Sequence, residues 1–304
     1  MRAKIVRGCI RFVAPVLLAN AAAAQPLPDS PSQHLWQAAR ERAWRLHRPA
    51  DPSLRAPVPQ VLVLHGGFGS ASQAESAYGW DALADREGFL VVYPDGIGRS
   101  WNAGGMCCGP ALREAVADTG FLARLIEAAA QAQHIDRRRI YLTGMSNGAE
   151  MAYRYACEDP VPVAAICPVA GTFSQACPNP KPVSVFAIHG LADAHVPFAG
   201  GPGTKGVTQG NWLPVEQTLQ AFRNADRCTR AQDRSQGAVR TRTEVCARGR
   251  EVVLTTIAAA GHPWPGSAAR TGPLARWLAA DPASTALDAT AVLWDFFRRH
   301  PAPP

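Results

Sequence analysis

The sequence predicts one α/β domain with a mainly parallel central sheet, helices on both faces of that sheet and no separate large cap domain. Short apolar runs recur along the chain with helical segments between them, which is the pattern of strands joined by crossover helices. Several runs are continuous rather than alternating, as expected for strands buried on both faces. The expected strands cover residues 61–64, 89–93, 140–143, 163–169, 183–188 and 252–257.

Helices are expected between these strands and near the end of the chain. Asp118 is expected to cap one of them, because a short carboxylate side chain can accept hydrogen bonds from the first-turn amides. The last helix ends in Arg298 and Arg299, and cations there complement the helix dipole. Apolar residues at a spacing of three and four mark the helices at 79–87, 118–132, 147–157, 214–224 and 285–299.

The first 24 residues have the composition of a cleavable export signal. A basic start is followed by an apolar run and by small residues that end at Ala24. The run is far shorter than the roughly 20 residues that a spanning helix needs, so no membrane anchor is expected in the mature form. We therefore expect a signal peptide over 1–24, a flexible stretch over 25–36 and one domain over 37–304, secreted to the periplasm or the extracellular medium.

The charge distribution does not suggest nucleic acid as a partner. The formal charge of +7 falls to +3 once the four basic residues of the first 24 are removed, and the remaining acids and bases are intermixed. One dense basic run occurs at 137–139, and it is expected to form a solvated turn between a helix and a strand.

Seven cysteines remain after the expected cleavage, and export to an oxidising compartment favours disulfides. Cys228 and Cys246 flank a polar segment, 229–244, which they could staple as a hairpin or a loop. An odd number leaves at least one thiol free, and Cys167 lies in an apolar run typical of the core. No spacing among the cysteines suits zinc. The sequence leaves open the pairing of Cys107, Cys108, Cys157, Cys167 and Cys177.

Ser146 lies in the sequence Gly144-Met145-Ser146-Asn147-Gly148, between a buried strand and an amphipathic helix. This context is typical of the nucleophile elbow of the α/β-hydrolase fold, in which a strained turn exposes the serine hydroxyl. Glycines flank the serine because larger side chains would collide with the neighbouring strand and helix. A glycine-rich turn without chemistry is the alternative.

An oxyanion formed by attack of Ser146 needs backbone amides to stabilise it. Leu64-His65-Gly66-Gly67 follows an early strand, at the place where hydrolases of this fold put a donor loop. The expected donors are the amides of Gly67 and Asn147. A simple glycine turn after a strand is the alternative interpretation.

In this fold the acid follows the serine and the histidine comes last. His262 follows the last predicted strand in a loop stiffened by prolines, which favours it as the base over His195; His300 lies at a helix end. Asp193 follows the strand at 183–188, where the acid is expected to orient His262. Asp193 could instead cap its own loop as an Asx turn.

Together these residues resemble the secreted polyhydroxybutyrate-depolymerase-like and feruloyl-esterase-like carboxylesterases of the α/β-hydrolase superfamily. The similar motifs run through almost the whole mature chain. They are Leu64-His65-Gly66-Gly67, residues 80–89, Tyr93-Pro94-Asp95, Trp101-Asn102, Cys107-Cys108-Gly109, Asp118-Thr119-Gly120-Phe121, residues 144–148, His189-Gly190, Asp193, Val196-Pro197, Gly261-His262 and Trp264-Pro265-Gly266.

The resemblance implies a serine esterase in which Ser146 is the nucleophile, Asp193 the acid and His262 the base. It implies that the amides of Gly67 and Asn147 form the oxyanion hole. The implied substrate is a hydroxyalkanoate oligomer, a short acyl ester or a phenolic ester, and the reaction needs no metal or organic cofactor.

By the same resemblance, Trp101 and Trp264 line the pocket for the acyl group or aromatic acid. The chain departs from the family pattern at three positions, which leaves the substrate more open than the chemistry. A feruloyl esterase is the main alternative, and a serine peptidase of the same fold or a non-catalytic binding protein is a weaker one. The three departures are Ala117, Glu150 and Phe222.

Overall fold

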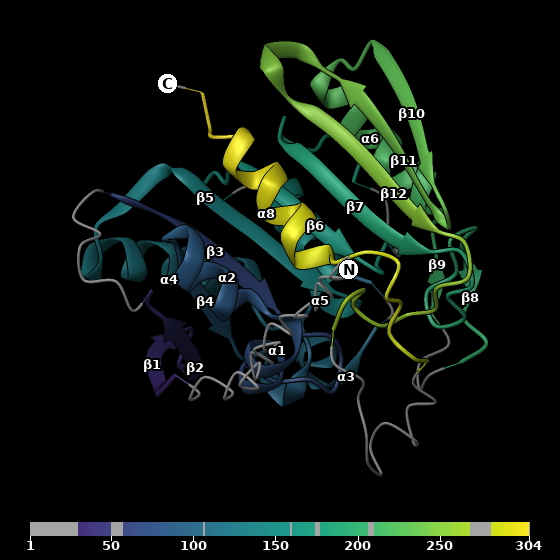
Figure 1. The fold of residues 1–304 in the computed structure, drawn as a ribbon. Coiled ribbons are helices and arrows are strands. Elements are labelled where there is room, and N and C mark those ends of the chain that lie inside the picture. Colours follow the sequence, from purple (N-terminus) through teal and green to yellow (C-terminus); the bar gives the residue numbers. More distant parts are fainter. Residues whose placement is uncertain are drawn as a thin grey trace, which may run out of the picture.

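A ten-stranded sheet runs through the centre of the computed structural model (Figure 1). The structure describes residues 30–49, 57–105, 107–158, 160–173, 177–205, 210–267 and 281–303, so the expected signal peptide over 1–24 lies outside them. Neighbouring strands are parallel in the centre of the sheet and antiparallel at both edges.

Six strands form the parallel centre of the sheet, and they are the six that the sequence predicts. Their boundaries differ from the prediction by a few residues. In order across the sheet they are β4 (Leu90–Pro94), β3 (Val58–Leu64), β5 (Ile135–Met145), β6 (Ala165–Val169), β7 (Ser184–Gly190) and β12 (Glu251–Ile257).

The basic run at 137–139 lies within β5 and not in a turn, contrary to the prediction. This first half of β5 is mostly solvent-exposed. Acidic neighbours compensate its charge, because Arg137 pairs with Glu127 at 2.6 Å and Arg139 pairs with Asp136 at 2.6 Å. Solvation and local ion pairs therefore allow a charged sequence to continue a strand.

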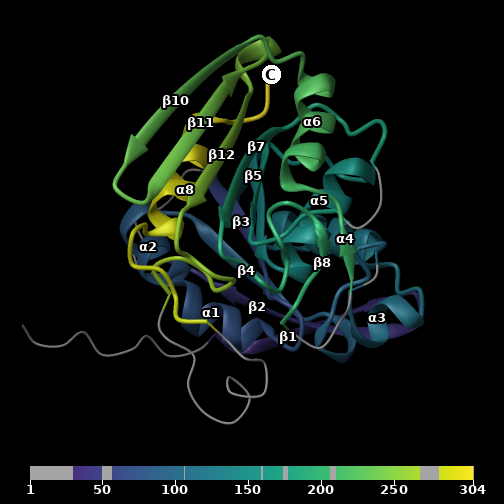
Figure 2. The same cartoon turned by 90° about the vertical axis from the view of Figure 1, so that its right-hand side faces the viewer.

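Helices cover both faces of the sheet (Figure 2). Side chains alternate between the faces, so Val61 and Val63 contact one helical layer while Leu62 contacts the other. The sequence did not predict the helix at Ala71–Tyr78, which carries few large apolar side chains. The layer on the Val61 face consists of α1 (Ala71–Tyr78), α2 (Trp80–Glu87) and α8 (Ala289–Arg299). The opposite layer consists of α4 (Asp118–Ala132), α5 (Asn147–Glu158) and α6 (Val215–Asp226).

Antiparallel strands extend the sheet at both edges. On one side β2 (Arg40–His47) pairs with β4 and with the edge strand β1 (Ser32–Gln37). On the other side β11 (Val239–Val245) pairs with β12 and with the edge strand β10 (Arg230–Gln236). The segment 229–244, which the sequence left open as a hairpin or a loop, is therefore mainly a hairpin.

The N-terminal hairpin corrects the expected flexible stretch over 25–36, because residues 32–36 lie in β1. The turn between β1 and β2 consists of Ala38 and Ala39, with φ of 49° and 60°. Positive φ at both positions is typical of a two-residue hairpin turn that usually contains Asn-Gly. The two alanines gave no such signal in the sequence.

A buried ion pair joins the edge strand β2 to α4. Arg42 Nη2 lies 2.7 Å from Asp118 Oδ1, and both side chains are almost completely inaccessible to solvent. Asp118 Oδ2 accepts the amide of Asn102 at 2.7 Å. The prediction that Asp118 caps α4 is therefore wrong: Ala117 holds the cap position, and the carboxylate turns away to Arg42 and Asn102.

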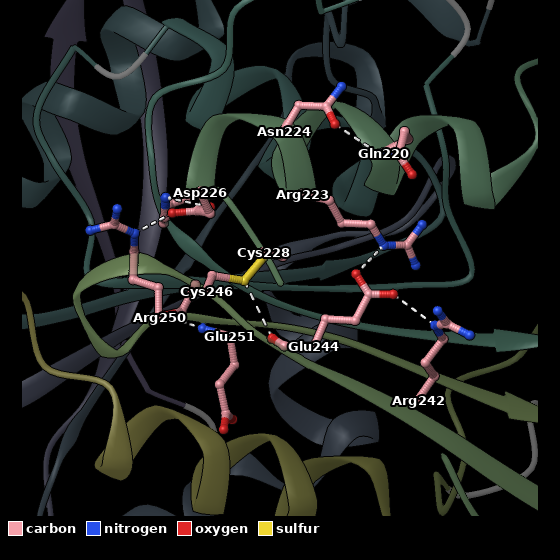
Figure 3. Close-up of a disulfide and its surroundings, with 12 residues drawn as sticks. Gln220, Arg223, Asn224, Asp226, Cys228, Arg242, Glu244, Cys246, Arg250 and Glu251 are labelled. Atoms are coloured by element: carbon pink, nitrogen blue, oxygen red, sulfur yellow. Dashed lines mark hydrogen bonds and ion pairs between the residues drawn. A yellow bond between two sulfur atoms is a disulfide. The ribbon is translucent and has the colours of Figure 1, made fainter. Parts of the chain in front are cut away.

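Three disulfides cross-link the described part of the chain, and Cys167 is a buried free thiol. Cys228 and Cys246, the pair favoured by the sequence, are bonded at the base of the β10–β11 hairpin (Figure 3). Their sequence separation is 18 residues. Closing a loop of that size stabilises a folded chain by about 3 kcal/mol. The other two bonds are Cys107–Cys108 and Cys157–Cys177.

Candidate active site

Ser146 lies at the sharp turn between β5 and α5. Its φ of 55° is in the left-handed region, which a serine adopts only where its surroundings hold it. The Ser146 amide donates to the Val169 carbonyl at 2.9 Å and ties the turn to β6. A methyl group on Gly144 would lie 2.6 Å from the Gly148 carbonyl oxygen, and one on Gly148 would lie 2.5 Å from the His65 carbonyl oxygen. Both glycines are therefore required by the turn, for the predicted reason.

Asp193 and His262 meet just beyond the ends of β7 and β12. His262 Nδ1 lies 2.7 Å from Asp193 Oδ2. The other carboxylate oxygen accepts the amides of His195 at 2.8 Å and Val196 at 3.0 Å. Asp193 therefore caps its own loop with one oxygen and holds His262 with the other. Nε2 of His262 is then the ring nitrogen that can exchange a proton with a substrate or a nucleophile.

The surroundings of Asp193 favour its ionised form. Burial opposes ionisation, but the charge and hydrogen bond of His262 outweigh it and hold the pKa of Asp193 below its ordinary value. His189 and the Val196 amide contribute in the same direction. An ionised carboxylate beside Nδ1 of His262 keeps the proton on that nitrogen and fixes the tautomer.

The two other candidate histidines do not replace His262. His195 stacks on the His262 ring, with ring centroids 4.8 Å apart. His300 is buried at the end of α8, and its Nδ1 lies 2.8 Å from the Phe296 carbonyl oxygen. Burial lowers the pKa of His300, although the Glu251 carboxylate, 3.3 Å from Nε2, acts in the opposite direction. His300 is therefore packed into the protein at the end of α8, away from the pocket.

Ser146 and His262 line one pocket, which has two apolar walls. One wall contains Tyr78 and Trp264, whose rings stack with centroids 4.6 Å apart. The other wall is a small cluster of buried side chains, Cys107, Cys108, Val196 and Trp212. The pocket therefore combines the polar side chains of Ser146 and His262 with apolar surfaces of the kind that bind apolar parts of ligands.

A buried histidine holds the loop after β3. His65 Nδ1 donates to the Gly66 carbonyl at 2.8 Å, and His65 Nε2 accepts the Gly96 amide at 3.0 Å. Burial lowers the pKa of His65 to about 4, so the ring is neutral and can accept through Nε2. Gly67 follows directly and lines the pocket with Ser146. The loop that carries the expected oxyanion donor is thus fixed by its own histidine.

Asn147 begins α5 immediately after Ser146, and its side chain anchors a neighbouring segment. Its Oδ1 accepts the Trp101 amide at 2.7 Å, and its Nδ2 donates to the Trp101 carbonyl at 3.1 Å. The Asn147 side chain therefore has a structural role, and the group expected to donate to the oxyanion is its backbone amide.

Trp101 does not line the pocket, which corrects the expectation from the sequence. Its indole is fully buried, and Nε1 donates to the His65 carbonyl at 2.9 Å. This hydrogen bond holds the Trp101 ring against the loop that carries the expected oxyanion donor, on the side away from the pocket. Trp264 is among the residues that line the pocket, and its contact with an acyl group or aromatic acid stays a prediction.

Three residues near the site were not expected there. Tyr78 comes from the end of α1, and Trp212 lies in β9 (Asn211–Trp212), which pairs with β8 (Gly201–Pro202). Trp212 Nε1 donates to Glu150 Oε1 at 2.7 Å. Glu150, a departure from the family pattern, is buried on α5, and this burial raises its pKa to about 7. In the sequence, Glu150 could have been recognised as a carboxylate on the face of its helix that is expected to be buried.

The described residues define a class of protein. A serine at a strand-turn-helix and a histidine after β12 line one pocket, and an acid after β7 is hydrogen-bonded to that histidine. The three residues follow the chain order of an α/β-hydrolase. The sequence model of the esterase PHB depolymerase family matches residues 43–198, just over half of the chain. The chain belongs to this family and is a carboxylic ester hydrolase.

Relatives agree with this assignment, and a solved structure agrees with the fold. "Putative esterase NocK" of Nocardia uniformis subsp. tsuyamanensis is 33% identical over 254 residues, which cover 75% of this chain and 72% of NocK. Feruloyl esterase B of Piromyces equi is 27% identical over 218 residues, but the match spans only 39% of that protein and 67% of this chain. The acetyl xylan esterase from Aspergillus awamori superposes with a TM-score of 0.53 at 14% identity, covering 78% of this chain and 94% of that one, and shows the shared fold.

Proposed function

We propose that this chain is a secreted serine esterase that hydrolyses small or oligomeric esters of the polyhydroxybutyrate type. The observation that carries the proposal is the 2.7 Å hydrogen bond between His262 Nδ1 and Asp193 Oδ2, in a pocket that Ser146 also lines. In this proposal Ser146 is the nucleophile, His262 the base and Asp193 the residue that orients it.

The proposed reaction has two acyl-transfer steps. His262 Nε2 takes the proton of the Ser146 hydroxyl as Oγ attacks the ester carbonyl, and the same proton goes to the departing alcohol. The resulting acyl-enzyme is then hydrolysed by a water molecule that His262 activates in the same way. Asp193 stabilises the imidazolium that forms in both steps, which agrees with its lowered pKa.

The amides of Gly67 and Asn147 would hold the oxyanion in both steps. Asn147 directly follows Ser146, and Gly67 lies in the pocket in the loop that His65 fixes. Two donors held in place before the reaction cost no reorganisation when charge develops on the substrate oxygen.

A feruloyl esterase is the alternative, and one observation favours it. The stacked rings of Tyr78 and Trp264 form a wall against which an aromatic acid could lie. The similarity to Feruloyl esterase B points the same way, although it spans less than half of that protein. The apolar side of Val196 and Trp212 suits an aliphatic acyl chain equally well. The oligomer remains the main proposal because the chain matches the model of the esterase PHB depolymerase family.

Export supports a substrate outside the cytoplasm. The three disulfides fit an oxidising compartment. Among the residues that the structure describes, no helix has both the length and the apolar character that a membrane span requires. The basic and apolar composition of residues 1–24 is the remaining support for secretion.

The test is hydrolysis by the mature protein, side by side, of p-nitrophenyl butyrate, methyl ferulate and a soluble 3-hydroxybutyrate oligomer. Ser146→Ala is expected to lose almost all turnover, on the order of 10⁴-fold or more, and to keep the fold. Preference for the oligomer would support the main proposal, and preference for ferulate the alternative. Turnover retained by Ser146→Ala would contradict the mechanism, and no turnover by the unaltered protein would favour a peptidase or a binding protein.

A further inference from the structure

The disulfide Cys107–Cys108 joins two neighbouring residues in the wall of the pocket. Both side chains are buried, with exposed fractions of 6% and 4%, and both line the pocket with Ser146 and His262. With Val196 they belong to an apolar cluster that is separate from the two large cores of the sheet faces. The proposed reaction does not use their sulfur atoms, so another property must explain their position.

Cys108 packs against the loop that carries the first expected oxyanion donor. A Cβ atom on Gly67 would lie 2.7 Å from the Cys108 sulfur, so this sulfur fills the space beside the Gly67 backbone. A free thiol could rotate away from that position. A sulfur bonded to its neighbour cannot, and it therefore limits where the Gly67 backbone can lie.

Cys107 is connected to the residue that carries the second expected donor. Asn147 Nδ2 lies 3.4 Å from the Cys107 carbonyl oxygen and 3.1 Å from the Trp101 carbonyl oxygen. The Cys108 sulfur thus lies beside Gly67, and the main-chain carbonyl of Cys107, the residue bonded to it, contacts the Asn147 side chain. The Cys107–Cys108 pair is therefore close to both segments whose amides are expected to point at the oxyanion.

A role in global stability explains this bond poorly. A disulfide restricts the unfolded chain more when it closes a longer loop. Cys157–Cys177 and Cys228–Cys246 span 20 and 18 positions, whereas Cys107 and Cys108 are adjacent. The adjacent pair restricts the unfolded chain least, so its effect is expected to be local.

We propose that the Cys107–Cys108 disulfide is a positioning element that holds the Gly67 and Asn147 amides in place for the oxyanion. This inference rests on the proposed function. Oxyanion donors act on the transition state more than on the bound substrate, so displacing them lowers kcat and leaves KM nearly unchanged.

The experiment compares Cys107→Ala/Cys108→Ala with the unaltered protein and with the matched control Cys228→Ala/Cys246→Ala, whose disulfide lies outside the pocket. The pocket variant is expected to lose roughly tenfold or more in kcat on p-nitrophenyl butyrate. Its KM should change by less than about threefold, and its melting temperature should barely move. The control should show a lower melting temperature and a kcat within about twofold of the unaltered protein.

A pocket variant that keeps its kcat, or that no longer folds, would contradict the proposal. A second measurement uses the unaltered chain and a small dithiol reductant. The dithiol gives two electrons and two protons to the Cys107–Cys108 bond, which becomes two thiols, and the dithiol closes to its own disulfide. Aliquots are alkylated and mapped by mass spectrometry, so that each pair's reduced fraction is known.

Activity should fall in step with the reduced fraction of Cys107–Cys108 and return on reoxidation. Activity that follows only the other two disulfides, or none of them, would contradict the proposal. Failure of the proposed function has a different signature, because then the unaltered protein would lack ester turnover or Ser146→Ala would retain it.

Discussion

Gly67, in the loop that carries the first expected oxyanion donor, has no room for a side chain. A methyl group there would lie 2.7 Å from the Cys108 sulfur, far inside van der Waals contact. Gly67→Ala should therefore shift the donor loop and lower kcat/KM by about tenfold or more. Gly120→Ala, in α4, is the control, because its methyl would meet only the flexible end of Gln37 at 3.1 Å.

The same substitution can be placed in the Cys107→Ala/Cys108→Ala background, where the sulfur is absent. The added loss should then be smaller than in the unaltered protein, and the difference measures the contact. Equal losses in both backgrounds would show that Cys108 does not restrict Gly67.

Glu150 should make the stability of the fold depend on pH. Burial raises the pKa of its carboxyl to about 7, even though hydrogen bonds from Trp212 and Asn147 and the charge of His262 act in the opposite direction. The folded protein then binds a proton that the unfolded chain has lost above its ordinary pKa of 4.5. The contribution of Glu150 to the free energy of unfolding therefore falls by on the order of 3 kcal/mol as pH rises from 4.5 to about 7.

Glu150→Gln removes this titration and keeps an oxygen that can accept the Trp212 hydrogen bond. Its free energy of unfolding relative to the unaltered protein should be higher at pH 8 than at pH 5, by up to about 3 kcal/mol. Urea unfolding at both pH values measures the difference. A pH-independent difference would mean that Glu150 titrates as an ordinary glutamate.

The sequence located residues along the chain better than it oriented their side chains. Gly144 and Gly148 were predicted correctly because the elbow imposes a local steric rule. Trp101 was placed wrongly, because a motif does not say whether an indole turns toward the pocket or toward the His65 carbonyl behind it. Tyr78 and Trp212 were missed because distant segments bring them to the site.

At the scale of the elements, the pair Arg42–Asp118 is a fully buried polar link between β2, in the antiparallel edge of the sheet, and α4. Both side chains are inaccessible to solvent, so a lone Arg42 charge would be left buried if Asp118 lost its own. Asp118→Asn should lower the free energy of unfolding by roughly 3 to 5 kcal/mol. Denaturant unfolding measures this loss.

Glu114→Gln is the matched control for that variant. The pair Arg40–Glu114 has a similar N–O distance of 2.7 Å, but its side chains are 41% and 45% exposed. Its loss should cost less than about 1 kcal/mol. Similar losses in the free energy of unfolding for both variants would show that burial does not determine how much these ion pairs stabilise the fold.

Elements buried on both faces were the ones that the sequence predicted. The parallel strands and the helices that pack on them carry continuous or periodic apolar residues, and these patterns depend on local sequence. The edge strands β1 and β10 have no such pattern, because one is half-exposed and the other fully exposed. Their pairing depends on neighbouring strands, which a local pattern does not contain.

At the scale of the whole molecule, the proposed reaction centre is separate from the cross-linked outer hairpin. The loops after β3, β5, β7 and β12 bring Gly67, Ser146, Asp193 and His262 to one end of the parallel centre. Cys228–Cys246 lies instead at the base of the outer hairpin, where Arg223–Glu244 and Arg250–Asp226 pairs surround it (Figure 3). Changes in that region should therefore affect stability and leave the chemistry intact.

Cys228→Ala/Cys246→Ala tests this separation. Removing a bond that spans 18 positions should lower the free energy of unfolding by about 3 kcal/mol, because the unfolded chain regains the freedom that loop closure removed. Urea unfolding at equal ionic strength measures the loss. A drop in ester turnover by the variant at temperatures where it is fully folded would show instead that the outer hairpin is coupled to the pocket, through the β11–β12 pairing that leads to the His262 loop.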